Sequence, residues 1–369
     1  MKDIIIKSNK ILSHDFKYFY KGELKISDGI ITNEINADAE IIDAEKFYVV
    51  PGLVDIHFHG CNGHDFCEGT HEAFKAVHDY ERSVGVTAIC PATMTLPKDR
   101  LLKIMEAAKN FHGKNFSGIY LEGPFISSQK LGAQNPAYVA KPDFNMLEEL
   151  QNISGNLIKI AAVAPEVDGA FEFIERAKNI TRLSLAHTTC NYETAKKSFE
   201  AGVSQVTHLF NAMPGINHRA PGPVVAALEN ENVSVEIICD GVHVHPSVVS
   251  LALKIFGDDR VIFISDSMEA AGMNDGVYEL GGQKVIKTGN LALLEDGKTI
   301  AGSVTNLFEC VKTAVQKMNI PLETAVKCAS LNPARAIGLE KSLGSLEPGK
   351  AAKILIVDEN LNLVRVIDL

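Results

Sequence analysis

The chain has 369 residues, of which 46% are hydrophobic and 22% charged, and its formal net charge is −10 at pH 7. This composition is typical of a globular protein with a large core, and the acidic balance without a basic run argues against nucleic acid as a partner. The seven cysteines form no C-x-x-C pair, which predicts reduced thiols in a cytoplasmic protein. We expect neither a membrane span nor a signal peptide, because no uncharged apolar stretch is long enough.

The two ends of the chain carry short strand patterns separated by turn residues. These patterns lie at 4–6, 23–26, 29–31, 39–43, 352–358 and 363–367. Each set is too small to be stable alone. We therefore expect residues 1–50 and 345–369 to combine in one β-sandwich.

Between the ends, eight apolar runs alternate with helical patterns. The runs are 53–58, 86–91, 118–122, 158–165, 182–187, 203–208, 233–240 and 261–266, and examples of the helical patterns are 70–84, 96–111, 192–200 and 246–256. Buried strands that alternate with helices predict an α/β fold with a parallel sheet, and eight such units predict a (β/α)8 TIM-type barrel over residues 51–344. A doubly wound sheet is the alternative, but no G-x-G-x-x-G follows the first run. Residues 277–303 interrupt the alternation as a hairpin-like insertion.

Residues of metal-binding types stand at the ends of several runs. His57 and His59 are spaced i, i+2, so on a strand they would point to the same face and share one divalent ion. The other such residues are Glu122, His187, His208, His243 and Asp266. The carboxyl ends of barrel strands share one rim, and active sites lie there. The pattern therefore predicts a metal site at this rim.

Each of these residues also has an ordinary explanation when taken singly. A lone histidine can be hydrogen-bonded in a core, Glu122 can be a loop carboxylate, and Asp266 can cap the next segment. His243-Val244-His245 is a second H-x-H, but its loop position favours His57 and His59 as the ligand pair. The combination, rather than any one residue, favours the metal site.

Longer strings extend this pattern across nearly the whole chain. They are PGLVDIHFHG (51–60), LEGPF (121–125), KLGAQNP (130–136), AHTTCN (186–191), HLFNAMP (208–214), DGVHVHP (240–246), ISDSMEAAG (264–272), AGSVTNL (301–307) and NPARAIGL (332–339). In these strings the chain resembles the N-acetylglucosamine-6-phosphate deacetylase family of the amidohydrolase superfamily. PGLVDIHFHG marks only the superfamily, whereas LEGPF, HLFNAMP and DGVH together are specific to the deacetylases.

The resemblance implies a barrel enzyme that hydrolyses the acetamide of N-acetyl-D-glucosamine 6-phosphate to D-glucosamine 6-phosphate and acetate. It places Glu122, His187 and His208 at the principal metal site. It makes Asp266 the general base and acid that acts with a metal-bound hydroxide, and it places His243 at the substrate. The implied substrate contacts are Ala133, Gln134, Asn211, Ala212, Arg219, His243, Ile300, Ala301 and Gly302.

The resemblance also implies cofactors and partners. The cofactor would be one or two divalent ions per subunit, zinc or iron, with His57 and His59 kept as in two-metal relatives and Glu122 able to bridge. The partners would be an amino-sugar phosphate and a second copy in a homodimer. Arg219 would bind the phosphate. Gln134 stands where some relatives carry a carbonyl-polarising histidine, so either its uncharged amide or a second metal would take that part.

Two alternatives stay open at this point. One is another amidohydrolase, such as a dihydroorotase- or hydantoinase-like cyclic amidase. Those enzymes often bridge two metals with a modified lysine, whereas the third run here ends in Glu122. The other is a non-catalytic homologue that acts as a binding protein, although such a protein should have lost ligand residues.

Overall fold

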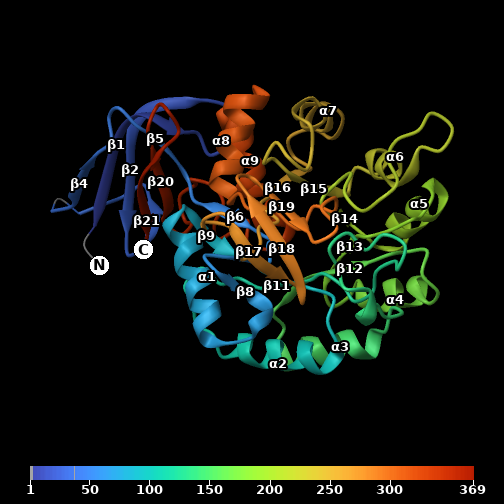
Figure 1. Cartoon of the computed structure of the whole chain (residues 1–369). Helices are drawn as coiled ribbons and strands as arrows, with labels where there is room; N and C mark the ends of the chain where they lie inside the picture. Colours follow the sequence, from blue (N-terminus) through green and yellow to red (C-terminus); the bar gives the residue numbers. More distant parts are fainter. Residues whose placement is uncertain (1–2, 37) are drawn as a thin grey trace.

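The computed structural model of the chain describes residues 3–36 and 38–369. Strands from the two chain ends lie together on one side of the molecule, and a larger α/β part makes up the rest (Figure 1). The first and the last strand of the described chain lie in the smaller, all-β part.

The strands of the two chain ends form one sheet, the terminal sheet. Its order is β21-β20-β5-β1-β2-β3, with β4 paired to β1. The strands are β1 (Ile4–Leu12), β2 (Phe19–Ser27), β3 (Ile30–Thr32), β4 (Glu40–Asp43), β5 (Tyr48–Pro51), β20 (Lys353–Val357) and β21 (Leu363–Asp368). β5 joins the two ends, because it pairs parallel with β1 and antiparallel with β20. The sandwich arrangement and the bounds 1–50 and 345–369 stay predictions.

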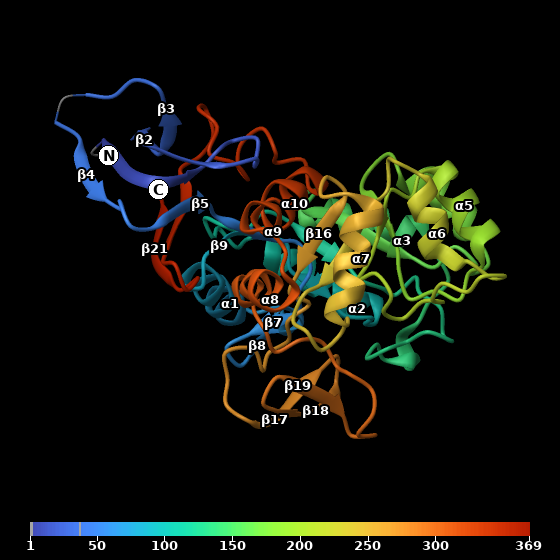
Figure 2. The ribbon, with the colours of Figure 1, turned by 90° about the horizontal axis from the view of Figure 1, so that it is seen from above.

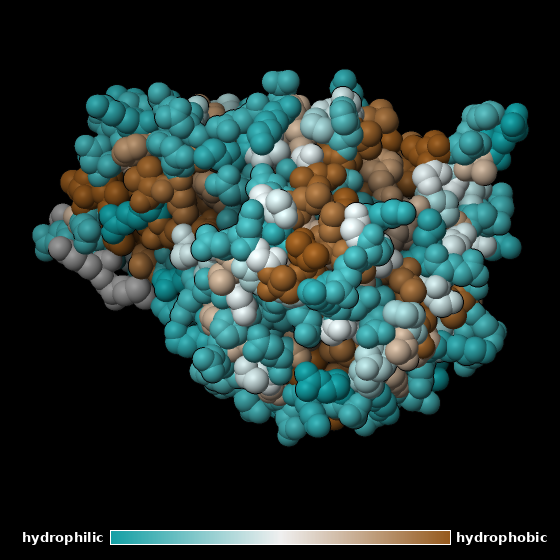
Figure 3. Space-filling view, viewed as in Figure 1, coloured by the Kyte–Doolittle hydropathy of each residue, from teal (hydrophilic) through white to brown (hydrophobic). Residues whose placement is uncertain are grey.

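Apolar side chains are exposed on the terminal sheet. Ile41 is 59% exposed, Tyr18 58% and Val364 50%. Figure 3 shows apolar surface gathered over this part of the molecule, and further apolar areas over the larger part. Exposed apolar area of this kind is typical of an interaction surface.

The larger part contains a curled sheet of parallel strands. Seven strands pair in chain order from β10 to β16, and β6 pairs with β9. The strands are β6 (Leu53–Asp55), β9 (Val86–Ile89), β10 (Ala92–Thr93), β11 (Ile119–Leu121), β12 (Ile158–Val163), β13 (Arg182–Leu185), β14 (Gln205–Val206), β15 (Ser234–Ile238) and β16 (Val261–Ile264). Each of the eight predicted runs contains a strand. These strands are almost entirely buried, which explains why they lack polar alternation.

Backbone hydrogen bonds connect the first run with the eighth beyond the ends of their strands. The N–H of Asp266 donates to the carbonyl of His57 at 2.9 Å, and the N–H of His59 donates to the carbonyl of Ser267 at 2.7 Å. The segments that follow β6 and β16 are therefore side by side. This contact brings the carboxyl ends of the first and last parallel strands to the same place.

Helices cover the outside of the curled sheet (Figure 2). They are α1 (His71–Ser83), α2 (Lys98–Lys109), α3 (Phe144–Ser154), α4 (Ala170–Ala177), α5 (Tyr192–Ala201), α6 (Gly222–Glu229), α7 (Pro246–Phe256), α8 (Leu307–Met318), α9 (Leu322–Ala329) and α10 (Leu331–Ala336), with short 3-10 turns η1 (Phe66–Glu68) and η2 (Pro136–Tyr138). The four helices predicted by periodicity are confirmed. α1 shows the local reason: the Thr70 side chain caps its start, and Ala73, Phe74 and Val77 form its buried face. No helix of the described chain has the length and apolarity of a membrane span.

A small antiparallel sheet follows β16. It consists of β17 (Gly276–Leu280), β18 (Gln283–Thr288) and β19 (Leu291–Leu294), and Figure 2 shows it as a separate layer beside the parallel strands. The segment predicted as hairpin-like thus holds a third strand. The Gln283 side chain donates to the carbonyl of Ala133 at 2.5 Å, which holds the small sheet against the loop after β11.

Candidate metal centre and substrate cavity

The carboxyl ends of the parallel strands surround a cavity of about 320 Å³. The predicted site residues that line it are His59, Glu122, Ala133, Gln134, His187, His208, Asn211, Ala212, His243, Asp266, Ile300 and Gly302. His57 and Ala301 are fully buried beside it. Arg219 is not among the lining residues and is exposed on the loop between β14 and α6. The lining residues that the sequence did not single out are Met94, Gly132, Leu280, Lys298 and Thr299.

Three donor atoms from three strand ends meet at one point. Glu122 follows β11, His187 follows β13 and His208 follows β14. Glu122 Oε1 lies 3.1 Å from Nε2 of His187 and 3.1 Å from Nε2 of His208, and the two nitrogens are themselves 3.1 Å apart. Ligands of one tetrahedral zinc ion at ~2.0–2.1 Å are separated by about 3.3 Å. The set therefore fits a single divalent ion.

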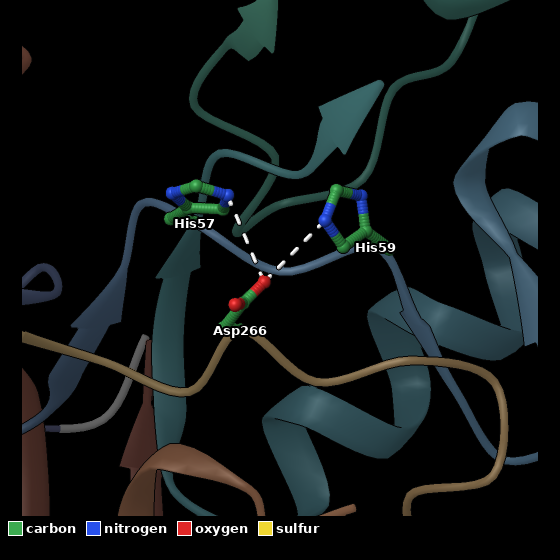
Figure 4. Close-up of side chains that lie close together, drawn as sticks. All are labelled: His57, His59 and Asp266. Carbon is green, nitrogen blue, oxygen red and sulfur yellow. Dashed lines mark ion pairs between the residues drawn. The ribbon is translucent and has the colours of Figure 1, made fainter. Parts of the chain in front are cut away.

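A second donor group adjoins the first (Figure 4). Asp266 Oδ1 lies 3.4 Å from His59 Nε2 and 3.8 Å from His57 Nε2. The Glu122 carboxylate reaches the same histidines, with Oε1 3.3 Å from His57 Nε2 and Oε2 3.3 Å from His59 Nε2. His57 Nε2 is buried without a hydrogen-bond partner, as expected of an atom suited to an ion. Glu122 thus faces both groups, the geometry of a bridging carboxylate.

The expectation that His57 and His59 are strand residues is wrong. β6 ends at Asp55, and both histidines lie in the segment that follows. The Asp55 carboxylate accepts the N–H of His57 at 3.3 Å and the Ser265 hydroxyl at 2.5 Å, which ends the strand and fixes the segment to the eighth run. Both side chains nevertheless point toward Asp266.

The backbone at three donor residues has positive φ. The values are 43° at His187, 28° at His208 and 48° at Asp266. A non-glycine residue with positive φ raises the conformational free energy of the chain by about 1–3 kcal/mol, and such residues cluster at functional sites. Three of them at the ends of three strands indicate that the strand ends are shaped to aim these side chains.

Hydrogen bonds on the far side of the donors fix their orientation. His57 Nδ1 is 2.8 Å from Glu236 Oε2, and His187 Nδ1 donates to the carbonyl of Lys130 at 2.9 Å. Donation from Nδ1 leaves the lone pair of Nε2 directed at the shared centre, the usual arrangement of metal-binding histidines. Gln134 Nε2 donates to Glu122 Oε2 at 2.6 Å. One amide N–H of Gln134 is thereby engaged in holding Glu122.

Glu236 is a site residue that the sequence reasoning missed. It is fully buried at the centre of β15, and besides His57 it contacts the Gln205 side chain and the N–H of His208 at 3.3 Å. The available signal was its position, because a glutamate inside an otherwise apolar buried run needs strong partners. Asp240 has a similar place beside His243, whose Nδ1 lies 2.7 Å from Asp240 Oδ2.

The electrostatics of the cluster keep its carboxylates ionised. Burial opposes the charge of Glu122 and Asp266, but the facing histidines hold the pKa of each carboxyl below its ordinary value. Burial also opposes charging His59, yet hydrogen bonds to Asp266 and Glu122 raise its pKa to about 10. A divalent cation supplies the same positive charge as these protons, so ion binding and protonation compete for the same nitrogens.

The chain is similar in sequence and structure to known proteins. The pattern of the amidohydrolase family matches residues 48–367. N-acetylglucosamine-6-phosphate deacetylase of Bacillus subtilis (strain 168) is 32% identical over 389 residues, covering 100% of this chain and 95% of that protein. N-acetylgalactosamine-6-phosphate deacetylase of Escherichia coli O157:H7 is 29% identical over 98% of this chain and 97% of that protein.

A solved structure matches over the same extent. It is N-acetyl-D-glucosamine-6-phosphate deacetylase from Mycobacterium smegmatis, in an aspartate-to-alanine mutant bound to N-acetyl-D-glucosamine-6-phosphate. The two structures superpose with a TM-score of 0.94 at 30% sequence identity, covering 100% of this chain and 98% of that one. The likeness therefore extends over the terminal sheet as well as the parallel strands.

Proposed function

This chain is a member of the amidohydrolase family, in the branch of the N-acetylglucosamine-6-phosphate deacetylases, and we propose that its substrate is N-acetyl-D-glucosamine 6-phosphate. The products are D-glucosamine 6-phosphate and acetate. One observation carries the proposal: Glu122 faces four imidazoles on the floor of a cavity of about 320 Å³. That volume is within the usual range for a small-molecule site.

The donor set supports a divalent cofactor, which we propose to be zinc or iron, one or two ions per subunit. Glu122, His187 and His208 would hold the first ion. His57 and His59, beside Asp266, would hold the second, with Glu122 within reach of both groups. When bound, such an ion would polarise the amide carbonyl and lower the pKa of water to about 7. Carboxylate and imidazole ligands suit both metals.

In this proposal the residues of the chain divide the work of amide hydrolysis. Asp266 is ionised and buried, so it accepts the proton of the attacking water and returns it to the departing amine. His243, held by Asp240, hydrogen-bonds the substrate. The proposed sugar contacts come from loops that line or adjoin the cavity: Ala133, Gln134, Asn211, Ala212, Ile300, Ala301 and Gly302.

We further propose the architecture of a (β/α)8 barrel over 51–344 with a β-sandwich from the two chain ends. The chain-order pairing of β10 to β16 and the hydrogen bonds between the first and eighth runs support the barrel. A homodimer and a cytoplasmic location complete the proposal. The dimer is checked by measuring the molar mass in solution.

A direct assay tests the proposed reaction. Acetate release is measured with N-acetylglucosamine 6-phosphate, its galactose isomer and unphosphorylated N-acetylglucosamine. Ring opening is measured with dihydroorotate and a hydantoin, and the metal content of the same preparation is determined. We expect the highest kcat/KM with N-acetylglucosamine 6-phosphate. Preference for a cyclic amide overturns the proposal, as does metal-loaded protein that binds the sugar without releasing acetate. Preference for the galactose isomer leaves the reaction but changes the substrate, an outcome that the Escherichia coli relative makes worth measuring.

Replacing Arg219 by alanine tests its proposed contact with the phosphate. A charge-assisted hydrogen bond contributes ~1.5–3 kcal/mol, so we expect KM for the phosphorylated sugar to rise about tenfold or more. KM for unphosphorylated N-acetylglucosamine should change much less. Equal effects on both sugars would remove Arg219 from the phosphate site, and its exposed position in the single chain makes this a sharp test.

Replacing Glu236 by glutamine tests the support of His57. In the wild type, the two carboxylate oxygens of Glu236 contact His57 and Gln205. The side chain of a glutamine has only one acceptor oxygen, so one of these contacts would be lost. Loss of such a partner typically lowers metal affinity about 10–100-fold. We expect less metal per chain after dialysis against a graded chelator, with the exposed Glu231→Gln as the control. Unchanged metal retention would show that Glu236 does not act through the ion.

A further inference from the structure

Lys298 occupies a distinctive place in the substrate cavity. Among the described residues that line the cavity, it alone carries a lysine or arginine side chain. It lies in the turn after β19, at the exposed mouth, whereas Glu122, His187 and His208 are 2–4% exposed on the floor. The cavity thus has an anionic, imidazole-rich floor and a cationic side chain at its opening.

The turn that carries Lys298 is fixed by its own hydrogen bonds. Asp296 Oδ1 accepts the N–H of Lys298 at 2.8 Å and that of Thr299 at 2.9 Å, and Oδ2 accepts the Thr299 hydroxyl at 2.6 Å. The N–H of Leu294 donates to the carbonyl of Thr299 at 2.9 Å. The backbone of Lys298 is therefore anchored next to the cavity, and only its side chain needs to be ordered by a ligand.

The other lysines of the small sheet are already engaged. Lys284 Nζ forms an ion pair with Glu295 at 2.8 Å, and Lys287 Nζ donates to the carbonyls of Ala270 and Met273. In the described part of the chain, Lys298 Nζ has no hydrogen bond or ion pair of this kind, and it interacts only through charge with Asp296 of the same turn. In a protein of net charge −10, this ammonium places a local positive charge beside the cavity.

The chemistry of the proposed substrate matches this polarity. In the pyranose ring, C2 carries the acetamide and lies across the ring from C5, which carries the phosphorylated C6. With the acetamide at the buried donors, the phosphate points away from the floor and toward the mouth. A phosphate dianion is costly to bury without a partner and is repelled by Glu122 and Asp266, so it requires a cation there.

We infer that Lys298 binds the 6-phosphate of the substrate and makes the enzyme selective for phosphorylated over unphosphorylated amino sugars. This inference rests on the proposed function and adds a recognition residue that belongs to the same subunit as the metal donors. Arg219 is exposed and outside the cavity lining, so Lys298 is the cation that a single chain itself offers to the bound sugar.

The experiment compares Lys298→Met and Lys298→Arg with the control Lys284→Met, each in the metal-loaded full chain. Methionine is unbranched and one atom shorter than lysine, and it removes the charge. We expect Lys298→Met to lose at least about tenfold more kcat/KM on N-acetylglucosamine 6-phosphate than on N-acetylglucosamine, chiefly through KM. Lys298→Arg should restore most of this selectivity, and Lys284→Met should keep it, because Lys284 pairs with Glu295 away from the cavity lining.

A second readout separates binding of the phosphate from binding of the sugar. Inorganic phosphate should compete with the phosphorylated sugar, and its inhibition constant should rise in Lys298→Met about as much as KM does. An equal loss on both sugars, or an unchanged constant for inorganic phosphate, would overturn the inference. Wild-type protein that hydrolyses neither sugar would instead overturn the proposed function, so the two failures are distinguishable.

Discussion

Asp266→Asn is expected to keep the ion held by Glu122, His187 and His208 and to lose nearly all turnover. The amide keeps the shape of the side chain but cannot accept the proton that the carboxylate takes at neutral pH. General acid–base catalysis typically contributes ~10²–10⁴-fold, so kcat should fall by at least that much. The measurement is acetate release under saturating substrate, together with metal content.

The position of Asp266 makes this prediction specific. Its carboxylate lies within 3.4 Å of His59 Nε2, and its backbone N–H is bonded to the carbonyl of His57 at 2.9 Å, so the substitution leaves the backbone anchor in place. The exposed Asp168→Asn serves as a control for the same chemical change. Robust activity in Asp266→Asn with wild-type metal content would refute the assigned role.

Glu122→Gln is expected to abolish activity by removing the ions themselves. Glu122 Oε1 faces His187, His208 and His57, and Oε2 faces His59, so one substitution affects both donor groups. The amide carries no negative charge to balance a dication. It also cannot balance protonated histidines, whose charged form burial already disfavours. We expect metal content to fall to background and kcat/KM to fall at least about 10³-fold, beyond the typical contribution of general acid–base catalysis alone.

A comparison with metal-free wild-type protein separates metal loss from misfolding. Wild-type protein treated with a chelator should match Glu122→Gln in activity, and only the wild type should recover when metal is returned. Glu148→Gln, on the exposed face of α3, should keep both metal and activity. Full activity of Glu122→Gln without metal would contradict the proposal that the reaction depends on a metal ion.

The strands of the parallel sheet could be predicted because their signal is local. Each run is apolar for four to eight residues and ends at a polar residue or turn, and burial on both faces produces that pattern without knowledge of neighbours. The donors of the metal centre were found for the same reason. His187, His208 and Asp266 are each the last residue of such a run, and the carboxyl ends of parallel strands meet at one rim.

The local sequence pattern does not show that the first apolar stretch holds two strands. Residues 48–54 read as one apolar stretch, yet β5 joins the terminal sheet and β6 joins the parallel strands, with Gly52 between them. A Cβ at Gly52 would lie 2.2 Å from the Thr87 hydroxyl oxygen, so only glycine allows the close approach at this junction. β5 pairs with β20 some 300 residues away, and the sequence near residue 50 does not contain that partner.

The amino-acid sequence by itself determined the kinds of chemistry available: apolar runs that must be buried, and imidazoles and carboxylates placed at their ends. The tertiary structure decided which of these groups share a centre. It placed the Glu122 carboxylate between two donor groups, gave His57 a buried partner in Glu236, and left Arg219 outside the cavity while Lys298 lines its mouth. Distances between residues far apart in the chain depend on how strands pair and loops close, and those are properties of the whole fold.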